Sequence, residues 1–319
     1  MYYLGIDSGG TKGSFLLTDE TGLILARSMQ PGCAFLSAGK EGVKRMVETG
    51  IRDVIRQAGI RKEEIRSLGL GINGYGEGEG SEEGTMEACD EAFIPGRSVC
   101  SLDTYVAWAG SLLFEAGVNI IAGTGSVVSG FTEDGRSARA GGWGAGCDEG
   151  SCTWIGQRVV EAFTKQADGR AEKTPIYHLF REKFGFDGED IHFITQLNRD
   201  IVRDGKGLAP LQMLLAEAWK AGDPEARRIY EAAAEELALG VEAVAAHLGM
   251  RDKPFPVSYS GGLFKSGACI LDPLRRILEK NGRTMKEPIY EPDVGAVLMA
   301  IRRAEPDYDV RNFRLRETD

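Results

Sequence analysis

One pattern occurs twice in this chain of 319 residues and restricts the folds open to it. An apolar stretch at residues 2–7 runs into Gly9-Gly10, and residues 13–18 then read as a second strand. Residues 118–122 run into Gly123-Thr124-Gly125-Ser126, and residues 127–131 again read as a strand. A Walker loop has a helix after its glycines, whereas a strand follows both turns here. The repetition predicts two duplicated, β-rich halves around a cleft.

The rest of the chain alternates between strand-like and helix-like segments, which predicts an α/β protein. Further strands are expected at residues 23–28, 68–72, 99–102 and 256–260. Helices are expected at residues 40–58, 105–114, 153–164, 208–221, 225–247, 271–281 and 294–303. The segment 74–84 is rich in Gly and Glu, so we expect a mobile acidic loop there.

Composition removes several classes of function. The net charge of −10 is spread along the chain and argues against nucleic acid as the main partner, because phosphate backbones need a basic face. There is no run of about 18 apolar residues, so no membrane span is expected. The N-terminus lacks a basic region and an apolar signal core, and the six cysteines include no CxxC pair. Reduced thiols in a cytoplasmic protein are the expectation.

The first glycine turn, Gly5-Ile6-Asp7-Ser8-Gly9-Gly10-Thr11-Lys12, has the chemistry of a phosphate site. Successive backbone N–H groups in a tight turn bind anions. Asp7, at the end of its strand, is placed to hold a water of a Mg²⁺ ion, since Mg²⁺ at nucleotide sites uses one or two carboxylates plus phosphates. A plain hairpin is the alternative for either turn alone, but two such turns can clamp one triphosphate.

Asp103 follows an apolar strand and opens a helix. A carboxylate at this point can orient an attacking hydroxyl for phosphoryl transfer. It can equally be a helix N-cap, so both readings stay open on the local sequence.

The run Gly141-Gly142-Trp143-Gly144, followed by Asp148-Glu149-Gly150-Ser151, suits a carbohydrate pocket. Bare backbone permits close approach, Trp offers an apolar face, and carboxylates accept hydrogen bonds from sugar hydroxyls. A glycine-rich turn that caps a helix near Ser151 is the alternative. Gly261-Gly262, after a strand, suits a nucleotide base or ribose that lies on bare backbone.

In combination, these features resemble the actin-like ATPase domain of sugar kinases, and most closely the N-acetylglucosamine kinases of the BadF/BadG/BcrA/BcrD ATPase family. The likeness runs from about residue 3 to residue 303. It implies two actin-like (ribonuclease H-like) α/β domains around an ATP cleft. The implied bounds are 1–113, then 114–292 with a helical insertion, and a C-terminal segment 293–319 whose helix packs back on the first domain.

The resemblance also implies roles for individual residues. Asp103 would be the base that faces the sugar 6-hydroxyl, and Asp7 would hold Mg²⁺ through water. The implied ATP contacts are Ser8, Gly9, Gly10, Thr11, Lys12, Gly123, Thr124, Gly125, Ala209, Gly261 and Gly262. The implied sugar contacts are Asn73, Asp103, Ser126, Gly142, Trp143, Gly144 and Asp148. A homodimer is expected only by analogy.

Three departures leave the sugar open. Relatives commonly have an Asn after the third strand, whereas residues 31–35 contain none; Asn73 would supply the polar contact instead. Val127 stands where relatives offer a polar residue, and the loop between Gly144 and Asp148 is one residue short. N-acetylglucosamine, N-acetylmuramic acid and glucosamine therefore all stay candidates. The rival classes are an ATPase activator of an acyl-CoA reductase or dehydratase and a non-catalytic sugar-sensing regulator.

Overall fold

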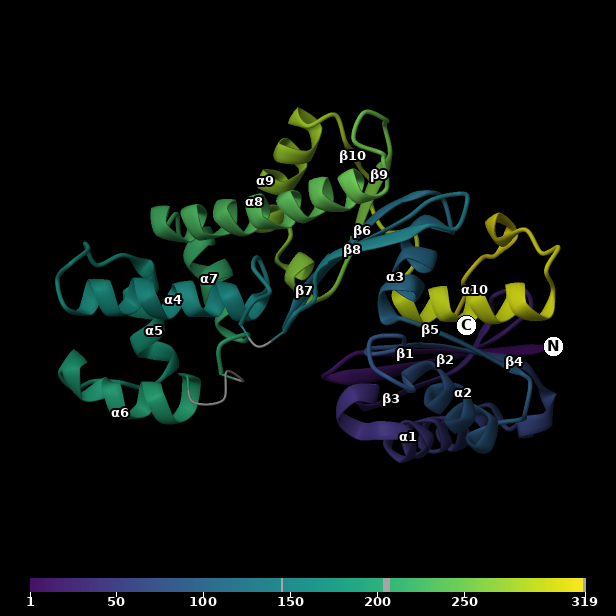
Figure 1. Ribbon diagram of the computed structural model, residues 1–319. Helices are drawn as coiled ribbons and strands as arrows, with labels where there is room; N and C mark the ends of the chain where they lie inside the picture. Colours follow the sequence, from purple (N-terminus) through teal and green to yellow (C-terminus); the bar gives the residue numbers. More distant parts are fainter. Residues whose placement is uncertain (145, 203–206, 318–319) are drawn as a thin grey trace. The chain divides into compact units, whose positions relative to one another are not determined.

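The computed structural model describes residues 1–144, 146–202 and 207–317. The chain forms two compact units: Met1–Glu115 together with Glu287–Asp319, and Ala116–Lys286. Each unit has its own five-stranded sheet (Figure 1).

The first unit is built on a sheet with the strand order β3-β2-β1-β4-β5. Its strands are β1 (Tyr2–Ser8), β2 (Lys12–Asp19), β3 (Ile24–Pro31), β4 (Ile65–Ile72) and β5 (Ser98–Ser101). The β1-β2-β3 meander is antiparallel, whereas β4 and β5 run parallel to β1. The carboxyl ends of β1, β4 and β5 therefore share one edge of the sheet, and the predicted site residues Asp7, Asn73 and Asp103 all lie at this edge.

Helices cover both faces of this sheet. They are α1 (Phe35–Ala58), α2 (Ser81–Ala92), α3 (Asp103–Leu112) and α10 (Pro292–Ala304), with short helical turns η1 (Lys62–Glu64) and η5 (Val310–Asn312). Leu4 and Ile6 of β1 pack into a core with α1 and α2, whereas Tyr3 and Leu16 face α10. In Figure 1, α1 and α2 accordingly lie on the opposite side of this sheet from α10.

Glycine lets α10 approach the sheet closely. A Cβ on Gly5 of β1 would lie 2.3 Å from the carbonyl oxygen of Asp293, and one on Gly295 would lie 1.9 Å from that of Val106. Since real Cβ atoms do not approach backbone so closely, these glycines fix α10 against β1 and α3. The first turn of α10 is thereby held over the end of β1.

The second unit repeats the topology of the first. Its strands are β6 (Gly117–Ala122), β7 (Ser126–Phe131), β8 (Ser137–Gly141), β9 (Pro256–Ser260) and β10 (Thr284–Met285). Read from β8, the order is β8-β7-β6-β9-β10, which is the first sheet's order of third, second, first, fourth and fifth strand. The duplication predicted from the two glycine turns is therefore present in the sheets.

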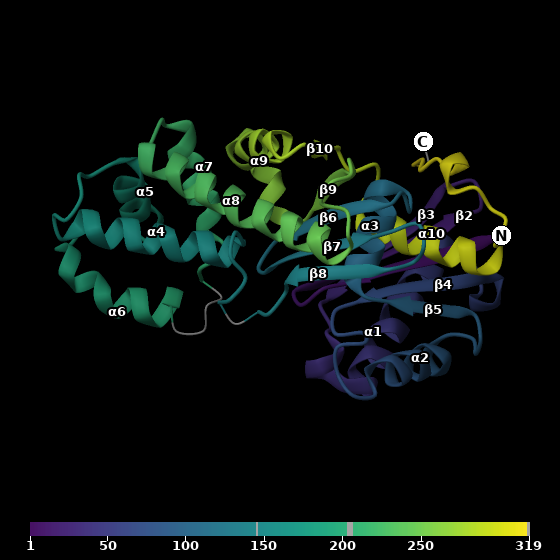
Figure 2. The same cartoon turned by 45° about the horizontal axis from the view of Figure 1, so that its top comes forward.

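Helices between β8 and β9 form most of the second unit's core. They are α4 (Cys152–Ala167), α5 (Pro175–Lys183), η2 (Asp190–Phe193), α6 (Ile194–Gln196), η3 (Leu197–Val202), α7 (Leu211–Lys220) and α8 (Pro224–His247), and η4 (Gly262–Ser266) and α9 (Ala268–Lys280) follow β9. Figure 2 shows α4, α5 and α7 grouped beside α8. The core joins the inner strands β6 and β7 to these helices. No helix among the described residues is long and apolar enough to cross a membrane.

Several predicted segments were wrong in detail. The expected acidic loop 74–84 ends early, because α2 begins at Ser81. The expected helix 105–114 stops at Leu112, since Leu113 and Phe114 adopt positive φ values of 50° and 63°. The expected helix 208–221 begins only at Leu211, after a turn. Strand β8 and helix α2 were not predicted.

Candidate functional site

The first glycine turn joins β1 to β2, as predicted. Gly9 N–H donates to the Lys12 carbonyl oxygen (3.1 Å), which closes the turn, and the side chains of Thr11 and Lys12 are exposed. The hydroxyl of Ser8 points inward instead. It donates to the carbonyl oxygen of Cys33 (2.9 Å) and accepts from the Cys33 N–H (3.2 Å). Ser8 therefore anchors the segment after β3, and the exposed part of the turn is left to Gly10, Thr11 and Lys12.

Gly32 supports this turn from behind and was not predicted as a site residue. A Cβ at this position would lie 2.5 Å from the Gly9 carbonyl oxygen and 2.6 Å from the Lys12 nitrogen. Only glycine fits there, because the turn's backbone occupies the space. The sequence signal for it is weak: Gly32 is one glycine after a strand, and its partner is 20 or more residues away in sequence.

The glycines of the turns differ from the chain's other glycines in one respect. Most glycines with defined surroundings have a positive φ or a neighbour that a Cβ would meet within 3.4 Å. Those with neither property are Gly9, Gly10, Gly13, Gly123, Gly188 and Gly262. Four of these six are predicted ATP contacts, namely Gly9, Gly10, Gly123 and Gly262. The folded chain itself does not require glycine at these four positions, and the space beside them is open.

Asp103 is the first residue of α3, directly after the end of β5. Its carboxylate accepts hydrogen bonds from the Thr104 N–H and the Asn73 side-chain amide. Burial raises the pKa of Asp103 above its ordinary value, and these two hydrogen bonds, together with one from the Asp103 backbone N–H, partly oppose that shift. A carboxylate with a raised pKa is a stronger base than an ordinary one, which suits proton acceptance from a hydroxyl.

Asn73 follows β4 and lies beside the segment that lacks the expected Asn. It forms a β-bridge with Ala34, and the Phe35 N–H donates to the Asn73 carbonyl oxygen (3.0 Å). The structure thus brings Asn73 next to residues 31–35 and in contact with Asp103. The Asn73 side chain thus contacts the predicted base, while its backbone pairs with the segment that lacks the expected Asn.

Asp7 lies in a strongly acidic part of the first unit. Burial raises the pKa of Asp7 well above its ordinary value; the negative charges of Asp103, Asp293 and Glu291 add to this, and Lys12 opposes it. Asp293, on the first turn of α10, was not predicted. A bound cation would relieve this repulsion.

These residues fit the Mg²⁺ that the fold family implies. The donors are carboxylate oxygens, which Mg²⁺ prefers. Among the described residues, no group of three or more His, Cys, Asp or Glu side chains can hold a metal ion by itself.

The second glycine turn joins β6 to β7 and is tied to the start of α4. Gly123 N–H donates to the Gly125 carbonyl oxygen (2.8 Å), and the Cys152 N–H donates to that of Gly123 (2.8 Å). The Thr153 hydroxyl donates to the Thr124 carbonyl oxygen (2.7 Å). Ser151 caps α4 by accepting from the Trp154 N–H (3.2 Å), so the predicted helix-capping role falls to Ser151.

Asp148 organises the predicted sugar loop. One carboxylate oxygen accepts from the N–H groups of Trp143 (2.8 Å) and Gly144 (3.0 Å), and the other from the Ser126 N–H (3.4 Å). A Cβ on Gly125 would lie 2.5 Å from this carboxylate. Asp148 is buried, and an ionised carboxylate has about four acceptor sites, so about one is left for a ligand hydroxyl. Trp143 itself is 78% exposed, with its ring free to cover a ligand.

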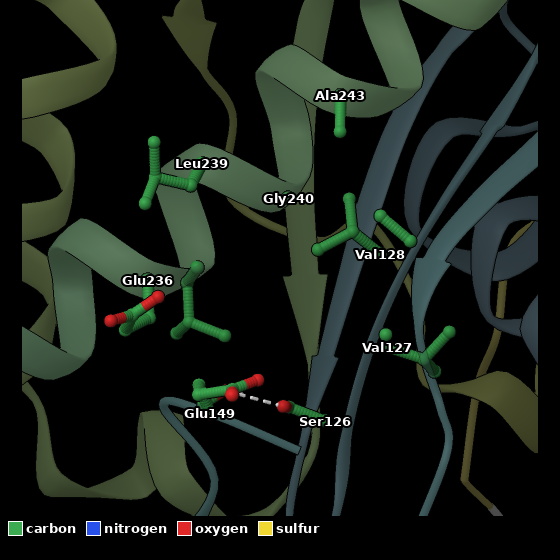
Figure 3. A pocket seen from close by; sticks show the side chains of 11 residues that line it. Ser126, Val127, Val128, Glu149, Glu236, Leu239, Gly240 and Ala243 are labelled. Atoms are coloured by element: carbon green, nitrogen blue, oxygen red, sulfur yellow. Dashed lines mark hydrogen bonds between the residues drawn. The ribbon is translucent and has the colours of Figure 1, made fainter. Parts of the chain in front are cut away.

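A pocket of about 250 Å³ adjoins this loop within the second unit. Figure 3 shows Val128 of β7 facing Leu239, Gly240 and Ala243 of α8 across it. At the other end of the pocket, the Ser126 hydroxyl donates to the Glu149 backbone carbonyl (2.6 Å). The remaining wall residues are Val127, Ala140, Gly141, Glu236 and Leu237. With apolar walls and two glutamates, the pocket suits a neutral or cationic group better than an anion.

The predicted adenosine residues meet the second turn inside this unit. Gly261 has φ of 107°, and a Cβ there would lie 2.3 Å from the Ala122 carbonyl oxygen. The Gly262 nitrogen would be 3.9 Å from a Cβ on Gly123. The turn that holds Ala209 leads into α7, where Gln212 accepts from the Ser266 hydroxyl (2.8 Å) at the end of η4. The segments of Gly123, Gly262 and Ala209 are thus connected.

Residues 4–300 match the BadF/BadG/BcrA/BcrD ATPase family. The chain belongs to this family. The resemblance drawn from the glycine turns and the sugar loop is therefore confirmed. The two units differ between their third and fourth strands: the first has α1 and η1 between β3 and β4, whereas the second has the helices from α4 to α8 between β8 and β9.

Curated relatives span nearly the whole chain. The N-acetylmuramic acid/N-acetylglucosamine kinase of Clostridium acetobutylicum is 29% identical and covers 96% of this chain and 99% of its own. The N-acetyl-D-glucosamine kinase of Dictyostelium discoideum is 28% identical, with 94% and 97% covered.

Solved structures agree on the fold. A Chromobacterium violaceum protein assigned as an N-acetylglucosamine kinase has a TM-score of 0.74 at 27% identity, with 94% of this chain and 98% of that chain covered. A glucokinase of the ROK family from Streptomyces griseus has a TM-score of 0.61 at 16% identity, with 94% and 98% covered. The predicted actin-like α/β class is confirmed.

Proposed function

We propose that this family member is an ATP-dependent amino-sugar kinase that transfers the γ-phosphate to the 6-hydroxyl of N-acetylglucosamine or a close relative. The enzyme class, ATP-dependent sugar kinase, agrees with the curated relatives. The observation that carries the proposal is the set of four glycines, Gly9, Gly10, Gly123 and Gly262, that the folded chain leaves open. All four lie on the turns that the sequence predicted to contact ATP.

In this mechanism the backbone N–H groups of the two turns and the side chain of Lys12 hold the phosphates. Mg²⁺, when bound, would neutralise charge on the transferred phosphoryl group, and Asp7 would hold it through water. Asp103 orients the sugar hydroxyl and accepts its proton as the oxygen attacks. The Asn73 side-chain amide, which donates to the Asp103 carboxylate, would help to orient that carboxylate toward the hydroxyl.

The sugar would lie against the loop of Gly142, Trp143 and Gly144, with Asp148 and Ser126 behind it. The raised pKa of Asp103 and its amide partner support the base assignment. N-acetylglucosamine, N-acetylmuramic acid and glucosamine stay candidates for the acceptor. The two glutamates of the adjoining pocket favour the uncharged acceptor N-acetylglucosamine over the acidic N-acetylmuramic acid, provided that the sugar's substituent enters that pocket.

The test is ADP release from Mg-ATP across a panel of sugars, with a control without sugar. The panel contains N-acetylglucosamine, N-acetylmuramic acid, glucosamine, N-acetylmannosamine and glucose. Strong stimulation by one amino sugar is expected, with phosphate on O6 of the product by NMR. Sugar-independent hydrolysis in an iron-containing protein would favour the activator class, and sugar binding without turnover would favour the regulator.

Asp103→Asn tests the base. The variant is expected to lose transfer by at least about 10²-fold, the lower end of what a positioned base contributes, while ADP binding is kept. Asp187→Asn, at an exposed carboxylate, is the matched control and should behave as wild type. Near-normal turnover by Asp103→Asn would refute the assignment.

A further inference from the structure

Asp293 is a buried carboxylate with no assigned role. It is the second residue of α10, and its side chain is only 7% exposed. A buried charge is costly unless it is paired and hydrogen-bonded. The close contact at Gly5 places the backbone of Asp293 against β1, two residues before Asp7.

The partners of Asp293 connect it with the end of β1. Its Oδ2 atom accepts from the Ser14 hydroxyl (2.7 Å), and its Oδ1 atom accepts from the Val294 N–H (2.9 Å). Ser14 is the cross-strand partner of Asp7 in the β1-β2 register. Directly paired residues of an antiparallel sheet project from the same face, so Asp7 and Ser14 are neighbours on the face that α10 covers.

The cation available to Asp293 is a weak partner. Arg27 Nη1 lies 3.5 Å from Oδ2, and the Arg27 side chain is 48% exposed. A surface-exposed guanidinium is screened by water and salt and only partly offsets a buried charge. Among the described residues, the Asp293 carboxylate therefore stands without a buried cationic partner beside Ser14, the cross-strand neighbour of Asp7.

We propose that Asp293 is a positioning residue for the magnesium–nucleotide site and acts through Ser14 on Asp7. Asp293 orients the Ser14 hydroxyl and thereby holds the end of the β1-β2 pair at Asp7 in place. Its carboxylate also adds negative charge near Asp7, which favours a divalent cation there. The inference rests on the proposed function only in that Asp7 serves Mg-nucleotide; it does not depend on the sugar.

The experiment compares Asp293→Asn and Ser14→Ala with wild type, and uses Arg27→Gln as the matched control. Binding of Mn²⁺ in the presence of ADP is followed by electron paramagnetic resonance, and ADP binding is titrated with and without Mg²⁺. Outer partners of metal sites typically contribute 10–100-fold to metal affinity. We expect a loss of about 10-fold or more for Asp293→Asn and a smaller loss for Ser14→Ala, whereas metal-free ADP binding is unchanged.

A purely structural role would give a different result. It would lower the melting temperature of Asp293→Asn and leave the Mn²⁺ affinity at the wild-type level, and this would overturn the proposal. Ser14→Ala removes one hydroxyl, so it carries the test if Asp293→Asn does not fold; wild-type Mn²⁺ affinity in Ser14→Ala would then refute the link to Asp7. Arg27→Gln removes a screened positive charge, so it should leave Mn²⁺ affinity unchanged or raise it slightly. A loss there equal to that of Asp293→Asn would trace the effect to the packing around the two side chains and overturn the role of the carboxylate.

The two proposals fail separately. If wild type binds Mn-ADP and Asp293→Asn weakens it, while no sugar stimulates ADP release, the role of Asp293 stands and the amino-sugar kinase assignment falls. If sugar-dependent transfer is strong and Mn²⁺ affinity is unaffected in both variants, the opposite holds.

Discussion

Replacing Gly10 by Ala separates what the fold needs from what the ligand needs. A Cβ at Gly10 would meet no protein atom within 4 Å, and the residue is outside the left-handed region. The apoprotein therefore accommodates the methyl group without strain. If a phosphate occupies this open space, as we propose, the same methyl group collides with the ligand.

The two effects have opposite signs. In the apoprotein, Gly→Ala at a compatible position stabilises by about 0.4–1 kcal/mol, because the unfolded chain loses freedom. For a unit of this size, that raises the melting temperature by roughly 1–4 °C. In the complex, overpacking costs about 1–3 kcal/mol. Since every 1.4 kcal/mol is about a factor of ten, nucleotide affinity should fall by roughly 5- to 150-fold.

The assay pairs thermal unfolding without nucleotide and calorimetric titration with Mg-ADP. Gly188→Ala is the control: a Cβ there would make only ordinary contact, 3.5 Å from Phe186, at a place with no predicted ligand. It should be as stable as wild type or slightly more so, and should bind nucleotide normally. A lower melting temperature for Gly10→Ala, or unchanged affinity, would refute the claim that this space is kept for phosphate.

Three further predictions concern the neighbouring groups. Gly32→Ala should destabilise by about 1–3 kcal/mol and weaken nucleotide binding, because the added Cβ would press on the turn's backbone; thermal unfolding and titration check both. Asp148→Ala should lower the unfolding free energy by ~3 kcal/mol and the sugar affinity more than the ADP affinity, since backbone N–H groups lose their acceptor; equal sugar affinity would contradict this. Asp103 acts ionised and its pKa is raised, so kcat/KM should fall as pH drops through a value above the ordinary Asp range, and Asn73→Ala, which removes a hydrogen bond that lowers this pKa, should shift the acid limb upward.

The sheets were predictable because their pattern is local. Apolar runs bounded by glycine mark β1, β6 and β9, and the duplication follows from two similar turns. Helix α2 was missed for a physical reason. Its N-cap residue is Gly80, which has no side chain to cap the helix, and none of its buried residues is a large apolar one: they are Ser81, Thr85, Ala88, Cys89 and Ala92. Contact with α1 and β5 makes that face part of the core, and the sequence of α2 alone does not indicate it.

The candidate site divides in the same way. In the sequence, each glycine turn, and Asp103, lies directly beside the strand or helix that positions it. Local motif and spacing therefore predict them. Gly32 and Asp293 belong to the site only through approach in space, Gly32 behind the first turn and Asp293 through α10. The bond between Asn73 and Asp103 likewise joins the ends of two strands that are separated by 25 or more residues of intervening chain.

The Asn73 contact also bears on the missing Asn of residues 31–35. A side chain placed on that segment would approach from Ala34, which is bridged to Asn73. Asn73 already holds Asp103, so an amide restored at position 34 would find the place beside the base occupied. We therefore expect Ala34→Asn alone to gain little sugar affinity, and Ala34→Asn with Asn73→Ala to recover part of what Asn73→Ala loses. Calorimetric titration with N-acetylglucosamine measures both. If Ala34→Asn alone strengthens binding and Asn73→Ala has no effect, the two positions are independent and Asn73 is not the replacement.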